Sequence, residues 1–304
     1  MGSPAQTRFR FRRSGFSEAN AFFILDCLGV EDLQSGRGRS QGMHDYLLAL
    51  DPEKYEYNRD FVFHFQTGTA QRFFESLTEI ALLCRSGLRP VLFIDGHGHP
   101  DKGLRLPSGE HVSWPDLLLH CQLIVQNSGG ELTVIAAACH SMEAIKHLEW
   151  DGRLPFAFYY GYPSTVSAGA VEKETRVVYE SLLRDGGLSA MRTPLALQVF
   201  SEYDHVMRHI AAALLISSEP AIMAGLIPEL SREMVSRVFE ENLVSQGMRL
   251  AGARKKLNSI LNSDQVAVQL ARHRMHDTPR LYRFIEDIRL HIAGGTWVQS
   301  YPAD

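Results

Sequence analysis

Short apolar runs alternate with segments of helical periodicity from residue 21 to about residue 184. Within segment 71–84, for example, Phe73, Leu77, Ile80 and Cys84 recur at the spacing of one helical face. The runs predicted as strands are 21–25, 61–65, 90–94, 132–138 and 156–160, and the predicted helices are 71–84, 115–125 (with Ser113 as N-cap) and 171–184. Strands that alternate with helices predict an α/β fold, in which a mostly parallel sheet is flanked by helices.

The pattern becomes wholly helical from about residue 195 onward. Leu281, Phe284, Ile285 and Ile288 form one apolar stripe there, as expected of a helix that packs one face on a core. We therefore predict an N-terminal arm at 1–18, an α/β domain at 19–194 and a helical C-terminal region at 195–304. The last of these would serve regulation or partner docking.

The composition is that of an ordinary folded protein, with 304 residues of which 45% are hydrophobic and 22% charged. A net charge of −4 argues against nucleic acid as a direct partner. The four cysteines are irregularly spaced and form no disulfide framework. No apolar stretch is long enough to span a membrane or to act as a signal peptide. We therefore expect a cytoplasmic protein, without membrane contact, whose thiols are free.

A cysteine and a histidine follow two of the predicted strands. Cys139 comes just after the fourth run and His97 just after the third. The carboxyl ends of parallel strands meet at one sheet edge, so the two residues fall on the same edge. A helix predicted to begin near Ser141 would favour the thiolate of Cys139, and a nearby imidazole would complete a Cys/His dyad. The N–H groups of Gly98 and Cys139 could then form an oxyanion hole.

Two alternatives remain open for this stretch. Asp95, His97 and His99 have D-x-H-x-H spacing, which is typical of a metal-dependent hydrolase. Such a motif usually ends the first strand and needs further ligands, whereas here it ends the third strand, with His111 and His120 in a loop and a helix. The other alternative is a catalytically idle scaffold, but neither residue of the dyad has been lost. We favour the dyad.

A strand ending in His-Gly and a later one ending in Ala-Cys resemble the caspase-like cysteine peptidases, which include caspases, metacaspases, separases, gingipains and bacterial CHAT proteases. The resemblance runs from about residue 21 to 190 and includes "HGHPDKG" and "FYYGYPSTVSAGAVEKETRVVYESLLRDGG". It implies a thiol protease with a caspase-like sheet, in which Cys139 is the nucleophile and His97 the general base and acid. It implies no metal or other cofactor for the chemistry. The segment formed by Val166, Ser167 and Ala168 would run beside the substrate backbone.

The sequence departs from the caspase pattern around the nucleophile. Ala137 replaces the caspase Gln, "CHS" replaces Cys-[RQG]-Gly, and no Trp-Arg pair occurs near Val166 to Ala170. Cleavage after aspartate is therefore not implied. Arg37 or Arg39 could receive an acidic side chain and Asp26 a basic one, and the sequence leaves that choice open. Only about 16 residues separate Cys139 from the next strand run, so single-chain enzymes of the CHAT or metacaspase kind are the better comparison.

The resemblance also suggests a biological setting. Bacterial CHAT and caspase-like proteins often act as inducible effectors in antiviral defence or regulated cell death, which implies a hydrolase that cleaves a protein or peptide substrate. A protease free in the cytoplasm needs restraint. We therefore expect a latent enzyme that is released by an activating protein partner, an upstream protease or oligomerisation.

Overall fold

The computed structural model describes residues 11–12, 18–56, 61–148, 152–185, 196–202, 205–206, 232–245, 247–261, 265–275 and 279–293. The chain divides into two compact units, Met1–Glu202 and Tyr203–Asp304. The first unit carries the sheet and the candidate site, and the described residues of the second are mainly helical.

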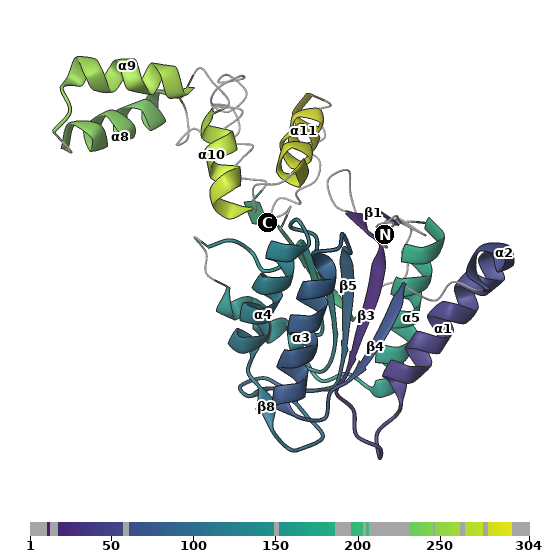
Figure 1. Ribbon diagram of the computed structural model, residues 1–304. Coiled ribbons are helices and arrows are strands. Elements are labelled where there is room, and N and C mark those ends of the chain that lie inside the picture. Colours follow the sequence, from purple (N-terminus) through teal and green to yellow (C-terminus); the bar gives the residue numbers. More distant parts are fainter. Residues whose placement is uncertain are drawn as a thin grey trace. The chain divides into compact units, whose positions relative to one another are not determined.

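A six-stranded sheet forms the centre of the first unit (Figure 1). The order is β11-β10-β9-β5-β3-β4, and all neighbours pair in parallel except β10 and β11. The strands are β3 (Ala21–Asp26), β4 (Val62–Gln66), β5 (Pro90–Asp95), β9 (Thr133–Ala137), β10 (Phe158–Gly161) and β11 (Gln198–Ser201). The predicted α/β fold with a mostly parallel sheet is confirmed.

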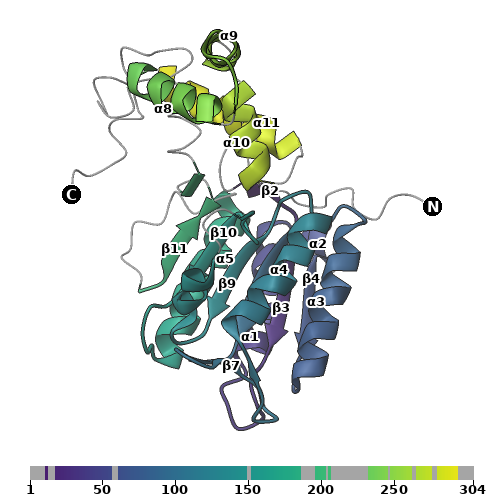
Figure 2. The same cartoon turned by 90° about the vertical axis from the view of Figure 1, so that its left-hand side faces the viewer.

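Helices cover both faces of this sheet (Figures 1 and 2). Helices α3 (Ala70–Cys84) and α4 (Trp114–Asn127) lie on one face, and α1 (Ser35–Leu50) and α5 (Ala168–Asp185) lie on the other. The short α2 (Pro52–Tyr55) follows α1. Alternate residues of β3 point to opposite faces, so Phe23 packs in the core beneath α3 and α4 while the neighbouring Phe22 is buried on the other side.

The helix starts follow the local sequence. The Thr69 side chain accepts a hydrogen bond from the Arg72 N–H at the start of α3, and Ser113 accepts one from the Asp116 N–H at the start of α4. Each side-chain oxygen satisfies a backbone donor that has no partner within the first turn. The predicted N-cap at Ser113 is confirmed.

The second unit contains helices α8 (Arg232–Ser245), α9 (Leu250–Leu261), α10 (Gln265–Arg274) and α11 (Pro279–Ala293). The stripe predicted in α11 is buried, with Leu281, Phe284 and Ile288 fully inaccessible. The expectation of helix from about residue 195 is wrong for residues 198–201, which form β11 at the edge of the sheet. Pairing with β10, a contact distant in sequence, decides the conformation of this short polar-apolar segment.

Most of the predicted arm at 1–18 lies outside the described residues. Its described part forms a two-stranded ribbon, in which β1 (Phe11–Arg12) pairs antiparallel with β2 (Glu18–Ala19). Within the described ranges, no helix is long and apolar enough to cross a membrane.

Candidate active site

The two residues of the predicted dyad follow neighbouring strands at equivalent positions. Asp95, the last residue of β5, pairs with Ala137, the last residue of β9. His97 and Cys139 each come two positions after this pair. The strand order reverses nearby, because β4 lies on one side of β3 and β5 on the other. Ligands of open α/β sheets bind in the crevice at the carboxyl ends of strands where the order reverses.

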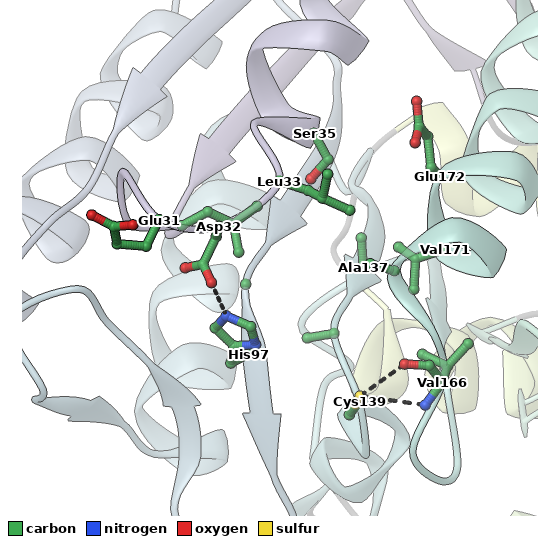
Figure 3. A pocket seen from close by; sticks show the side chains of 14 residues that line it. Glu31, Asp32, Leu33, Ser35, His97, Ala137, Cys139, Val166, Val171 and Glu172 are labelled. Carbon is green, nitrogen blue, oxygen red and sulfur yellow. Dashed lines mark hydrogen bonds and ion pairs between the residues drawn. The ribbon is translucent and has the colours of Figure 1, made fainter.

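A pocket of about 340 Å³ lies at this edge (Figure 3). Loops that follow β3, β5, β9 and β10 contribute to its walls, and α5 closes one side. The lining residues are Leu28, Glu31, Asp32, Leu33, Ser35, Gly96, His97, Ala137, Ala138, Cys139, Val166, Ala168, Val171 and Glu172. The pocket therefore contains both residues of the dyad, although they are 42 positions apart in the chain.

The backbone at Gly98 lies against the backbone of Cys139. A β-carbon placed on Gly98 would lie 1.8 Å from the Cys139 carbonyl oxygen and 3.3 Å from its nitrogen. Only glycine fits such a close approach. Gly98 belongs to β6 (His97–His99), which pairs with β7 (Gly103–Arg105), and β7 in turn pairs with β8 (His111–Val112). This small antiparallel sheet lies at the carboxyl edge of the central sheet (Figure 2), and its first strand carries His97, which lines the pocket.

Cys139 stands in a tight turn after β9. His140 adopts a left-handed conformation (φ 55°), and its N–H donates to the Ser164 carbonyl at 3.2 Å. The Cys139 thiol is partly exposed and is held by Val166, whose N–H lies 3.4 Å and whose carbonyl oxygen lies 3.5 Å from Sγ. The sulfur therefore has a defined position on the wall of the pocket.

The segment after Cys139 corrects one sequence prediction. Ser141–His147 forms a short 3₁₀ helix, η1, rather than the α-helix expected from Ser141 onward. A segment of this length and geometry lacks the aligned dipole of a long α-helix, so the proposed activation of Cys139 by a helix N-terminus has no support. The backbone of Val166, rather than a helix N-terminus, contacts the sulfur.

The predicted oxyanion donors are the backbone N–H groups of Cys139 and Gly98. Within the described part of the chain, the Cys139 N–H donates to no protein acceptor. An unpaired N–H next to a nucleophile is the type of group that stabilises an oxyanion. Gly98, the other residue predicted to supply such a donor, lies against Cys139 as described above.

His97 interacts with a residue that the sequence interpretation missed. Its Nε2 lies 2.9 Å from Oδ1 of Asp32, which stands in the loop between β3 and α1. Asp32 and Cys139 lie on opposite sides of the His97 ring (Figure 3). No hydrogen bond joins His97 to Cys139 in the residues described, and both side chains line the pocket. The sequence signal that could have identified Asp32 is its place, since it is an acidic residue shortly after the first strand and at the same sheet edge.

Three residues proposed to choose between acidic and basic substrates do not line the pocket. Arg39 is buried, and its guanidinium forms a double contact with Asp95, at 2.5 Å from Nη2 to Oδ1 and 3.1 Å from Nε to Oδ2. Asp26 is also buried and pairs with His64 at 3.2 Å. Arg37 is exposed on α1. Arg39 and Asp26 are thus engaged in the core, which argues against the roles suggested for them.

The residues expected to run beside a substrate lie where β10 leads into α5. Val166 and Ala168 line the pocket together with Ala137. Ser167 is not among the lining residues. Its side chain instead accepts a hydrogen bond from the Ala170 N–H at 3.3 Å, as an N-cap of α5 does. Acidic groups of the lining are Glu31, Asp32 and Glu172, and no lysine or arginine belongs to it.

The side chains of the alternative metal motif make separate contacts. Asp95 is buried against Arg39, and His97 contacts Asp32. The Nδ1 atom of His99 accepts the N–H of Asp101 at 3.1 Å within its own turn. No group of three candidate metal ligands gathers among the residues that the structure describes. The D-x-H-x-H stretch therefore does not converge on one point.

Comparison with protein-family models gave no match to this chain, and comparison with curated proteins found no similar sequence.

Proposed function

We propose that this protein is a caspase-like cysteine endopeptidase that uses the Cys139/His97 dyad. The observation that carries the proposal is the meeting of the two residues in one pocket at the carboxyl edge of the sheet, with the Gly98 backbone against Cys139. A free, partly exposed thiol, a ring nitrogen and an unpaired N–H are the three parts that acyl transfer requires.

The chemistry follows from these parts. The Cys139 sulfur attacks the peptide carbonyl carbon after its proton passes to His97, and the carbonyl oxygen becomes an oxyanion that the Cys139 and Gly98 N–H groups hold. Collapse of this intermediate breaks the C–N bond, and the leaving amine takes the proton from His97. A water molecule, deprotonated by His97, then hydrolyses the thioester and restores the thiol. No redox partner is needed.

The substrate in this proposal is a protein or peptide. Val166 and Ala168 line the pocket beside Cys139, where a peptide backbone can lie, and the volume of the pocket suits a side chain or two. Because Arg39 is buried in an ion pair, an acidic side chain has no buried arginine to meet in this pocket.

The biological setting is inferred from the motif resemblance alone. We infer a cytoplasmic effector of prokaryotic antiviral defence or regulated cell death, kept latent until an activating partner or an upstream protease acts on it. The helical unit Tyr203–Asp304 is the part to which we assign docking or regulation. Purified protein that cleaves many unfolded substrates without an activator would contradict the latent state.

The test is covalent labelling with a library of peptidyl acyloxymethyl ketones, read by intact mass and peptide mapping. Wild type, Cys139→Ala and His97→Ala are compared, each with and without EDTA. We expect an adduct on Cys139 that both variants lose and that EDTA does not change. The library member that reacts fastest reports the preferred side chain.

The buried thiols of Cys27, Cys84 and Cys121 serve as internal controls, because they lie outside the pocket and should carry no adduct. Activity that EDTA abolishes, with zinc or manganese bound in stoichiometric amount through His97 and His99, would instead support the metal hydrolase. Unchanged labelling and turnover in the Cys139→Ala variant would refute the proposal.

A further inference from the structure

We propose that Asp32 is a positioning residue, which holds His97 in one tautomer and one orientation so that the site works as a Cys139–His97–Asp32 triad. This inference rests on the proposed function, because it assigns a role to Asp32 in the same proton transfer. The dyad inferred from sequence contained no third member.

The loop between β3 and α1 presents the Asp32 carboxylate in a fixed direction. Oδ2 accepts the Gly29 N–H at 2.8 Å, while Oδ1 faces Nε2 of His97 at 2.9 Å. The Asp32 N–H donates in turn to the Gly29 carbonyl at 3.1 Å, and the Gln34 amide donates to the carbonyls of Gly29 and Asp32. Because one carboxylate oxygen is held by its own loop, the other cannot turn freely away from His97.

The charge state of Asp32 determines which nitrogen of His97 carries the proton. The hydrogen bond from His97, that from the Gly29 N–H and the positive charge of Arg105 lower the pKa of the Asp32 carboxyl. An ionised carboxylate only accepts hydrogen bonds, so Nε2 must be the protonated nitrogen of the neutral ring. The lone pair is then on Nδ1, which leaves that atom as the base.

The placement of the other groups agrees with this assignment. Asp32 and Cys139 lie on opposite sides of the ring, so a base at Nδ1 is turned away from the carboxylate (Figure 3). Arg105 stands opposite His97 across the β6–β7 pair. Among the residues that the structure describes, no hydrogen bond or ion pair joins the ring to Glu31 or Glu172, the further carboxylates of the pocket. In the described part of the chain, Asp32 is thus the carboxylate that contacts His97 directly.

The first test reads the tautomer itself by ¹⁵N NMR of histidine-labelled protein, at a pH where the ring is neutral. The His97 signals are identified by their loss in His97→Gln. We expect a proton on Nε2 in wild type, a mixture of tautomers or a proton on Nδ1 in Asp32→Asn, and recovery of the Nε2 form in Asp32→Glu. The control is Asp101→Asn, which removes an exposed carboxylate of the same hairpin without touching His97.

The second test measures turnover of the best peptide from the labelling library. Asp32→Asn should lower kcat by roughly 100- to 10,000-fold with little change in KM, and Asp32→Glu should recover part of the loss. If wild type is active and Asp32→Asn keeps its kcat, the triad is refuted while the protease proposal stands.

The two tests separate the two proposals. A wild type whose Cys139 reacts with no peptidyl warhead contradicts the proposed protease site, whereas an absence of turnover alone agrees with the latent state. In either case the NMR result still decides whether Asp32 sets the tautomer. A proton on Nδ1 in wild type, or the same tautomer ratio in Asp32→Asn, overturns the inference whatever the activity. Thermal unfolding of each variant identifies one that fails to fold, and Asp32→Ser, which also removes the carboxylate, then replaces Asp32→Asn in the comparison.

Discussion

Gly98 and Cys139, which follow different strands, lie so close that a β-carbon on Gly98 would be 1.8 Å from the Cys139 carbonyl oxygen. The contact joins strand β6, which carries His97, to the turn that carries the sulfur. It therefore fixes the relative position of the two residues on which the proposed chemistry depends, and it explains in physical terms why glycine follows His97.

Substitution of Gly98 by alanine should disturb both the site and the fold. The added methyl group overlaps backbone atoms, which cannot move as easily as the end of a side chain. We expect a loss of about 1–3 kcal/mol in the free energy of unfolding and a fall of at least about 100-fold in the rate of Cys139 labelling by a peptidyl warhead. Urea denaturation followed by circular dichroism, together with labelling kinetics, measures the two effects.

The matched control is Gly38→Ala in α1. A β-carbon at Gly38 meets no atom within 4 Å, and the position is helical. Alanine should therefore leave stability unchanged or raise it by about 0.4–1 kcal/mol. Equal losses in both variants would show that the close contact at Gly98 is not the cause.

The four thiols should differ sharply in reactivity. Burial raises the pKa of Cys27, Cys84 and Cys121 to about 12, whereas Cys139 is partly exposed in the pocket. In folded protein at about pH 8, a disulfide reagent should therefore modify one thiol rapidly and the other three only after unfolding. Cys139→Ala should abolish the fast phase. Fast reaction of a second thiol in that variant would contradict the buried positions.

The raised thiol pKa values also predict how stability changes at high pH. An unfolded thiol loses its proton near pH 8.5, while the buried ones keep theirs up to about pH 12. The unfolded state therefore binds fewer protons than the folded state between these values, and the free energy of unfolding should fall as the pH rises through this range. Comparison of wild type with Cys84→Ala at about pH 7 and about pH 10 isolates the contribution of one thiol. Identical slopes would contradict the prediction.

The strand ends that carry His97 and Cys139 were predictable because each follows a run of buried apolar residues. Such runs are local features of the sequence, and parallel strands bring their carboxyl ends to one edge. Asp32 could not be assigned in the same way. It stands in a loop whose conformation depends on contacts with Gly29, Gln34 and the distant His97. The position of Asp32 after the first strand places it at that edge, but nothing in the sequence pairs it with His97.

The structural role of Arg39 could not be predicted from the sequence for a related reason. Its partner Asp95 is 56 positions away, and no pattern in the sequence links α1 to the end of β5. The guanidinium also contacts Thr175 and stacks 4.9 Å from the centre of the Phe93 ring. The sequence therefore suggested that Arg39 could receive an acidic substrate side chain, whereas the structure places this arginine in the core.

Removal of this arginine should be costly. Arg39→Met leaves the Asp95 carboxylate buried without its counter-charge, which should lower the free energy of unfolding by about 3–5 kcal/mol. The double variant Arg39→Met/Asp95→Leu should recover a large part of the loss, since it leaves no uncompensated charge. Urea denaturation of the two single variants and the double variant measures the coupling. A double variant less stable than the sum of the single losses would contradict this account.

Arg37→Met provides the matched control for that cycle. Arg37 lies two positions earlier on the same helix and is exposed, so its substitution should change stability by no more than about 0.5 kcal/mol. Preference of the active enzyme for an acidic peptide that disappears in Arg37→Met would show that the exposed arginine, rather than Arg39, recognises such a substrate.

Ser141 connects the turn that bears the nucleophile to the two strands beside it. Its buried hydroxyl donates to the Ala136 carbonyl at 2.9 Å and accepts the Tyr162 N–H at 2.9 Å. Ser141→Ala leaves both backbone groups without this partner in the interior. We expect a loss of about 1–3 kcal/mol in the free energy of unfolding. We also expect the rate of Cys139 labelling, relative to that of wild type, to fall more for a peptidyl warhead than for iodoacetamide.

The difference between the two reagents separates position from reactivity. Iodoacetamide needs only an accessible sulfur, whereas a peptidyl warhead also needs the sulfur, His97 and the N–H donors in register. Ser86→Ala is the control, because the Ser86 hydroxyl is exposed and donates to the Leu83 carbonyl at 2.7 Å, so its loss should cost no more than about 0.5 kcal/mol. An equal fall in both labelling rates for Ser141→Ala would mean that the serine protects the fold of the turn without orienting Cys139 toward its substrate.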